Sequence, residues 1–192
     1  MAESLEFHDL PSGTVELLHV TYEPAAVKKL LRENLGVEDD RDLSAEQKEV
    51  VEEFYFYCYA FCKESGFDAS KTSTFMSIAK ATFHDDRSRD EFSCGMKQSF
   101  ARFKELVLSH AVNRSPWAVR VFSEDDVARI ISYMLNSYFR HFKMYKLIFT
   151  RKLQVTLDQS EPHLVEPPRR NFEPLERAIF DPLPASAGSR GL

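Results

Sequence analysis

The chain has 192 residues, 43 % of them apolar and 29 % charged, which is typical of a globular protein with one substantial hydrophobic core. The formal net charge of -5 argues against general nucleic-acid binding, because that activity requires a net basic face. Sixteen Phe and only six Gly favour helices over a turn-rich β architecture.

The N-terminal segment, residues 1–23, shows little periodicity, and the alternation in its stretch VELLHVTY predicts extended backbone. Its first residues, MAESLEFHDLPSG, contain neither the basic region nor the apolar region of a signal peptide. The longest apolar run of the chain, FYFYCYAFC, has nine residues, far fewer than the roughly 20 that a membrane span needs. We therefore expect a soluble intracellular protein without a membrane partner.

Two helices are predicted next, and each has sequence signals at its ends. Pro24 suits the first turn of a helix, and Gly36 stands where a helix-ending glycine belongs. Ser44 and Gln47 form the pattern of a capping box for a second helix that continues to about Glu64. This second helix is apolar on nearly every side, which predicts a central position in the fold.

The spacing of apolar residues predicts three further helices. Residues 70–83 hold apolar side chains at helical spacing, and Ser88 with Glu91 forms a second capping-box pattern before a periodic stretch that ends near Val107. Ser123, followed by three acids, begins the last and longest helix, which is predicted to run for about six turns. Its apolar stripe consists of Val127, Ile131, Met134, Tyr138, Phe142, Tyr145 and Phe149.

The composition changes after Gln159, because six of the nine prolines lie beyond it and no helical period remains. Such a segment cannot form a core of its own, so we expect an extended arm. The predicted fold is all-α: a single helical bundle domain of five or six helices over residues 24–157, preceded by the extended segment 1–23 and followed by an extended Pro-rich C-terminal arm, residues 158–192.

No sequence pattern predicts an enzyme, since the motifs of phosphate-binding loops, nucleophile elbows and zinc proteases do not occur. Cys58 and Cys62 lie one helical turn apart, but a structural zinc site needs four ligands, so two buried thiols are the favoured interpretation. For the polar cluster His84, Asp85 and Asp86 at a helix end, capping and solvation are favoured over catalysis. We predict no catalytic residue, no metal and no cofactor.

The stretch SYFRHFKMYKLIFTRKLQ, residues 137–154, alternates bulky apolar and basic side chains and contains no acid. Three interpretations remain open: a core helix with a solvated basic face, a docking surface for an acidic protein, or part of a nucleic-acid or membrane site. For calmodulin as the acidic protein, Leu135, Phe142 and Ile148 are the predicted anchors. The candidate partner-binding residues are Phe139, Arg140, Phe142, Lys143, Tyr145, Lys146, Ile148, Arg151 and Lys152.

The runs TSTFMSIAKATF and MKQSFARFKELVLSHAVNRSPWAVRVFSEDDVARIISYMLNSYFRHFKMYKLIFTRKLQ resemble the CLAMP family. The resemblance covers residues 70–157 and consists of a helix pattern with a Ser-Pro-Trp break and a last helix that ends in Phe-Thr-Arg-Lys. The members of this family are small subunits of a projection on the central-pair microtubules of motile cilia and flagella. The resemblance implies a place in the axonemal cytoskeleton and a non-enzymatic role, and it assigns the candidate residues to an interaction surface only.

The partners implied by the resemblance are a large scaffold protein of the central apparatus, other small projection subunits in this microtubule-associated complex, and calmodulin as a further candidate. We expect a structural and assembly subunit that helps to regulate ciliary and flagellar motility through protein–protein docking. The alternative is a calcium-dependent regulatory protein whose basic C-terminal helix is a calmodulin target. An enzyme would instead need a polar pocket with convergent titratable groups.

Overall fold

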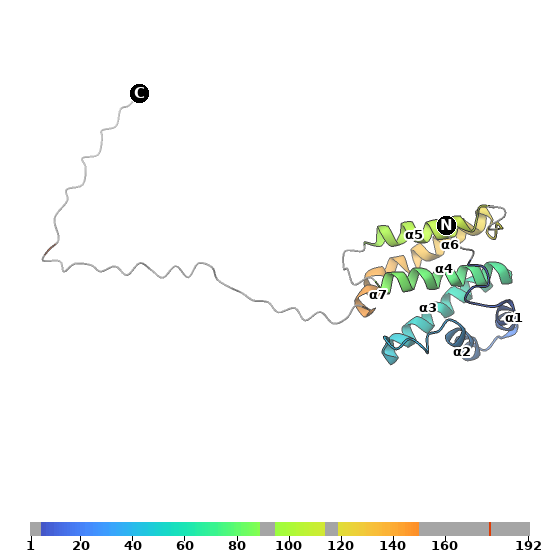
Figure 1. The fold of residues 1–192 in the computed structure, drawn as a ribbon, viewed down its shortest axis with the longest axis horizontal. Coiled ribbons are helices and arrows are strands. Elements are labelled where there is room, and N and C mark those ends of the chain that lie inside the picture. The colour runs from blue at the N-terminus through green and yellow to red at the C-terminus, as the bar shows by residue number, and fades with distance from the viewer. Residues whose placement is uncertain (1–4, 89–94, 114–118, 150–176, 178–192) are drawn as a thin grey trace, which may run out of the picture. The chain divides into compact units, whose positions relative to one another are not determined.

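The computed structural model describes residues 5–88, 95–113 and 119–149, together with Arg177 (Figure 1). The chain divides into two compact units, Met1–Leu153 and Gln154–Leu192, and the fold described below belongs to the first. The described residues form helices and no strand, which confirms the all-α prediction. The elements are α1 (Ser12–Val20), α2 (Pro24–Asn34), α3 (Ala45–Glu64), α4 (Ala69–Ser88), α5 (Met96–Ser109), α6 (Glu124–Asn136), the 3-10 helix η1 (Phe139–His141) and α7 (Phe142–Phe149).

The ends of α2 and α3 follow their sequence signals closely. Pro24 occupies the first turn of α2, and Gly36 lies just beyond the end of α2 with a φ of 72°, a conformation that favours glycine. At the start of α3, the hydroxyl of Ser44 accepts a hydrogen bond from the backbone N–H of Gln47 at 3.3 Å. The side chain of Gln47 accepts one in return from the N–H of Ser44 at 2.9 Å, so the predicted capping box is confirmed.

The N-terminal segment differs from its prediction, because VELLHVTY lies largely in helix α1 and not in extended backbone. Val15 and Leu18, three residues apart, are both fully buried on the face of α1 toward the core. The hydroxyl of Tyr59 on α3 donates to the carbonyl of Leu18 at 2.7 Å, which satisfies a carbonyl near the helix end. Tertiary contacts therefore hold α1, which has no side-chain cap of its own.

The central helix is α4, which packs against α1, α3, α5 and α7 (Figure 1). Eight consecutive residues of α4, from Thr72 to Ala79, are buried, whereas α3 leaves Tyr57 61 % exposed. The small Ser and Thr side chains of α4 allow neighbouring segments to approach its backbone closely. Ser73, for example, donates to the carbonyl of Leu10 at 2.8 Å and accepts from the N–H of Phe7 at 3.1 Å.

The buried imidazole of His110, just after α5, fastens another part of the N-terminal segment. Its Nε2 accepts a hydrogen bond from the backbone N–H of Leu5 at 3.0 Å. Its backbone carbonyl accepts from the N–H groups of Val121 and Phe122, at 2.8 and 3.2 Å. His110 thus joins Leu5, the end of α5 and the residues that lead into α6.

A second buried polar residue, Asp126, stabilises the start of α6. Asp126 and Ser123 form a reciprocal capping box, in which the Asp126 carboxylate accepts from the N–H of Ser123 at 3.0 Å. Lys71 on α4 lies 2.9 Å from the same carboxylate. Burial alone would raise the pKa of Asp126, but the hydrogen bonds from Lys71 and Ser123 outweigh it and lower the pKa to about 2.

The last predicted helix is divided in two, which corrects the prediction of one helix of about six turns. Helix α6 ends at Asn136, and the backbone of Ser137 leaves the helical region with φ and ψ of -102° and -83°. The Ser137 hydroxyl donates to the carbonyl of Tyr133 at 2.7 Å, so the side chain bonds to the preceding turn of backbone at the break. The break brings both Tyr138 and Phe139, adjacent in sequence, into the core at 2 % exposure.

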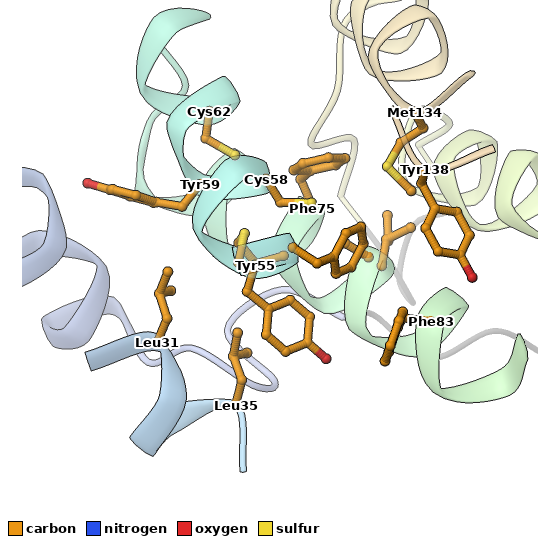
Figure 2. Packing of buried hydrophobic residues seen from close by; sticks show 14 of the residues in the cluster. Leu31, Leu35, Tyr55, Cys58, Tyr59, Cys62, Phe75, Phe83, Met134 and Tyr138 are labelled. Atoms are coloured by element: carbon orange, nitrogen blue, oxygen red, sulfur yellow. The ribbon is translucent and has the colours of Figure 1, made fainter. Parts of the chain in front are cut away.

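Phe83 of α4 connects the helices on either side of the aromatic core (Figure 2). Its ring centroid lies 5.3 Å from that of Phe54 on α3, 6.3 Å from that of Tyr138 and 5.1 Å from that of Phe149 on α7. Offset and edge-on ring pairs of this kind add to the free energy gained by burying the rings themselves.

Replacing Phe83 by Ala should lower the free energy of unfolding by about 3–5 kcal/mol, because the substitution leaves a cavity between three helices. Tyr57→Ala, at a largely exposed position of α3, should change it by about 0.5 kcal/mol or less. Urea unfolding followed by far-UV circular dichroism measures both values. Similar losses in the two variants would contradict this description of the core.

Candidate interaction surface

The apolar members of the predicted partner-binding set lie mainly inside the domain. Phe139 and Phe142 are 2 % and 5 % exposed, and the ring of Phe139 lies 5.2 Å from that of Phe100 on α5. Tyr145 and Ile148 are half-buried on α7. These side chains belong to the core or its margin, which agrees with the first of the three interpretations of this stretch.

The basic members of the set lie on the outside of the same segment. Arg140 and Lys143 are exposed, whereas Lys146 is half-buried and its ammonium group donates to the backbone carbonyl of Asp86. Arg140 and Lys143 therefore form the accessible charged surface, and Lys146 also has a structural contact with α4. The two remaining candidates, Arg151 and Lys152, lie outside the described residues.

A groove of about 670 Å³ is formed where the start of α5 meets η1 and the first turn of α7. Phe139 and Phe142 form its floor. Met96 of α5 and Met144 of α7 form its apolar walls and are 48 % and 52 % exposed. We call this feature the basic groove, because the other side chains that line it are almost all cationic.

Arg140, Lys143 and Lys146 line the basic groove together with His141. No Asp or Glu is among its lining residues in the described part of the chain. Cations that surround an apolar floor produce a local positive potential, even though the chain has a net charge of -5. The groove can therefore hold apolar side chains and favour negative charge at its rim.

Beneath the groove lies Asp86, a residue whose role the sequence did not reveal. Capping and solvation were predicted for it, but Asp86 lies within α4 at 3 % exposure, so the prediction is wrong for this residue. One carboxylate oxygen accepts hydrogen bonds from the hydroxyl of Ser99 on α5, at 2.5 Å, and from that of Tyr138, at 2.8 Å. The other oxygen has no hydrogen-bond partner among the described residues.

Burial raises the pKa of Asp86 above its ordinary value of 3.8, although Ser99, Tyr138 and Lys146 act against the shift. The carboxylate joins α4 to α5 and to the residue that begins the turn into η1. Because Tyr138 is adjacent to Phe139, this network determines where the groove floor lies. Asp86 therefore contributes to the surface through the side chains that it positions.

The two cysteines of α3 are buried, as predicted (Figure 2). Burial raises the pKa of Cys58 to about 12 and that of Cys62 well above its ordinary value. At neutral pH both are therefore thiols, and a thiol is neither the nucleophilic nor the metal-binding form of cysteine. The described residues contain no group of three or more His, Cys, Asp or Glu placed to hold a metal ion.

No helix in the described ranges is long and apolar enough to cross a membrane. The described residues define an all-α protein with a cation-lined apolar groove on its surface. A family model gives a more specific identification: the model described as CLAMP, flagellar C1a complex subunit C1a-32, matches residues 57–157. The match spans more than half of the chain, so this chain belongs to the CLAMP family.

Membership in the family confirms the resemblance and places the protein in the axoneme of cilia and flagella. The CLAMP family is one of structural subunits of the flagellar C1a complex of the central pair. The protein therefore associates with other components of the central-pair projection. The match begins in α3, upstream of the first resembling run, and continues beyond α7.

Asp86→Asn should change how stability depends on pH. The pKa of Asp86 is raised in the folded state, so its contribution to stability is present below about pH 3.8 and is lost as the pH rises through the folded pKa. The variant has no carboxyl group at position 86 that could ionise. Its free energy of unfolding minus that of the wild type should therefore increase as the pH rises, in urea titrations between about pH 3 and pH 7.

Asp126→Asn provides a control, because the pKa of Asp126 is shifted in the opposite direction to that of Asp86. The pKa of Asp126 is lowered to about 2, so its contribution is present above the unfolded pKa of 3.8 and is lost as the pH falls toward 2. The Asp126 variant should be less stable than the wild type at neutral pH, with a difference that shrinks in acid. A difference for Asp86→Asn that does not vary with pH would contradict the description of its buried network.

Proposed function

We propose that this protein is a non-enzymatic structural and assembly subunit of the central-apparatus projection, which helps to regulate ciliary and flagellar motility through protein–protein docking. Its membership in a family of C1a complex subunits supports the cellular role. The observation that carries the docking role is the basic groove, an apolar hollow lined by cations in a chain of net negative charge. Exposed apolar surface with a polar rim is typical of protein interaction sites.

The absence of an enzymatic activity is part of the proposal. Its support is the family, whose members are structural subunits, and the state of the buried titratable groups. The cysteines are protonated in the core, and Asp86 contacts hydroxyl groups of its own domain. Neither the two cysteines nor Asp86 is among the residues that line the basic groove, and an active site requires titratable groups that converge on an accessible pocket.

The proposed partners are a large scaffold protein of the central apparatus and other small projection subunits. The exposed guanidinium and ammonium groups of Arg140 and Lys143 suit an acidic surface on one of them. The Pro-rich arm, residues 158–192, remains a second proposed docking element, since a segment of this composition gains order on a partner. The arm lies almost wholly outside the described residues.

The calmodulin alternative is less well supported. Of its predicted anchors, Phe142 is 5 % exposed and Ile148 is half-buried, while Leu135 lies on the far side of the break at Ser137. Calmodulin grooves accept a continuous helix with accessible apolar anchors. To bind in this way, α7 would have to leave the core and join α6 as one helix.

Reversing the charges of Arg140 and Lys143 to Glu should reduce recovery of central-pair projection subunits in a pull-down from axonemal extract. Both side chains are exposed, so the fold should persist with an unchanged melting temperature. Lys146 is unsuitable for this test, because its contact with the Asp86 carbonyl ties it to the fold. The matched control reverses Lys29 and Lys104, two exposed cations on α2 and α5. Equal recovery by both double variants would show that the basic groove does not dock a projection subunit.

The folded full-length chain should not retain calcium-loaded calmodulin, because two of the three anchors are shielded: Phe142 is 5 % exposed and Ile148 is half-buried. A synthetic peptide of residues 133–154 serves as the comparison, since the same anchors are accessible in it. Both are measured by calorimetric titration with and without calcium. Stoichiometric, calcium-dependent binding by the folded chain would favour the calmodulin alternative over the one proposed.

A further inference from the structure

We propose that the basic groove binds an acidic amphipathic helix of a partner protein. In this arrangement the helix places apolar side chains between the exposed Met96 and Met144, over the nearly buried rings of Phe139 and Phe142. Its carboxylates contact Arg140 and Lys143. The inference rests on the proposed docking function and deepens it by naming the kind of segment that docks.

The shape and lining of the groove favour apolar side chains at its centre. Its floor consists of two aromatic rings 6.3 Å apart and nearly parallel, those of Phe139 and Phe142. Met96 and Met144 flank this floor, and each keeps about half of its surface exposed. Methionine side chains are flexible and polarisable, so such walls adapt to the apolar residues of a partner. Covering them would remove apolar surface from water, which is the main favourable contribution to most protein association.

The charges that line the groove favour an acidic partner. Arg140 and Lys143 face solvent, Lys146 lies deeper, and no carboxylate is among the described lining residues. A basic helix would bring like charges together, whereas an acidic one would gain ion pairs with Arg140 and Lys143 at the rim. Such complementarity sets partner specificity and the association rate, and salt weakens it.

The all-α fold favours a helix as the form of the bound segment. The described residues contain no strand, so they offer no sheet edge to which an extended segment could add. The alternative mode that recurs in proteins lays an amphipathic helix into an apolar groove between helices. The walls of the basic groove come from the start of α5 and from η1 with α7, which suits this mode.

A second hollow of similar volume, about 680 Å³, supplies a natural control within the same domain. It lies between α4 and α5, and the charged residues that line it are of both signs: Asp85, Arg102 and Glu105. Asp85 and Arg102 are already paired at 2.5 Å. With two acids and one base, this hollow lacks the excess of positive charge that lines the basic groove.

The test uses the full-length chain and designed helical peptides that differ only in charge. One peptide carries Leu at positions i, i+3 and i+7 with Glu on its flanks, and its partner carries Lys in place of Glu. A third has the composition of the first with the Leu residues scattered around the helix. Fluorescence polarisation should show the acidic amphipathic peptide binding about tenfold or more tightly than the other two, with an affinity that falls as salt is added.

The place of binding is read from the methyl NMR signals of the methionines. Met96 and Met144 should shift as the acidic peptide is added, whereas Met76 and Met134, both at 0 % exposure in the core, serve as internal references. Met144→Glu should abolish binding without unfolding the chain, because the side chain is exposed. Leu108→Glu, in the second hollow, should leave binding unchanged.

Three results would overturn the inference. The first is that the acidic and basic peptides bind equally well. The second is that a peptide binds without shifting the Met96 and Met144 signals. The third is that this chain forms a dimer that Met144→Glu disrupts. If the peptides fail while the wild-type chain still recovers projection subunits from axonemal extract, the proposed function stands and this inference is wrong. If the peptides bind as expected but no projection subunit is recovered, the proposed function is the one that fails.

Discussion

The burial of the middle of α4, from Thr72 to Ala79, on all sides is the constraint on which the rest of the structure depends. A helix with eight consecutive buried residues can be covered only if its small side chains let α1, α3, α5 and α7 approach closely. Ser and Thr meet this requirement, because their hydroxyls bond to nearby carbonyls: those of Thr74 and Thr82 donate to carbonyls one turn earlier, both at 2.8 Å. The C-terminal half of α4 then supplies Phe83 and Asp86, which hold the segment that forms the groove.

Three consecutive residues link the aromatic core to the basic groove. Tyr138 donates to Asp86, and its neighbour Phe139 packs on α5 and forms part of the groove floor. Arg140, next in sequence, is exposed at the rim. The groove is thus the outer side of a packed aromatic cluster, and its shape is as rigid as that cluster. A preformed apolar floor costs little ordering entropy when it is covered.

The sequence predicted well where local chemistry decides the structure. Capping residues predicted two helix starts, at Ser44 and Ser123, and the apolar spacing of the last predicted helix identified the buried Met134, Tyr138 and Phe142. The predictions from sequence failed where contacts between residues far apart in the chain determine the structure. Helix α1 depends on Tyr59 and α4, the central role of α4 is concealed by its Ser and Thr residues, and Asp86 resembles a solvated acid until Ser99 and Tyr138 reach it. For the candidate surface, the residue types indicated apolar and basic groups. Which of them form the floor and which form the rim could not be predicted, because that depends on the break in the helix at Ser137.

That break has a consequence for how the segment can be studied outside the protein. A synthetic peptide that spans α6 and α7 is free to form one continuous helix, with Phe142 and Tyr138 on an exposed stripe. In the folded chain Tyr138 and Phe142 face inward, and the accessible side chains include Arg140, Lys143, Met144 and Leu147. Peptide arrays and short fragments would therefore select partners for a face that the intact protein conceals. Reagents that present α5 and α7 together would preserve the surface of the folded chain at this place.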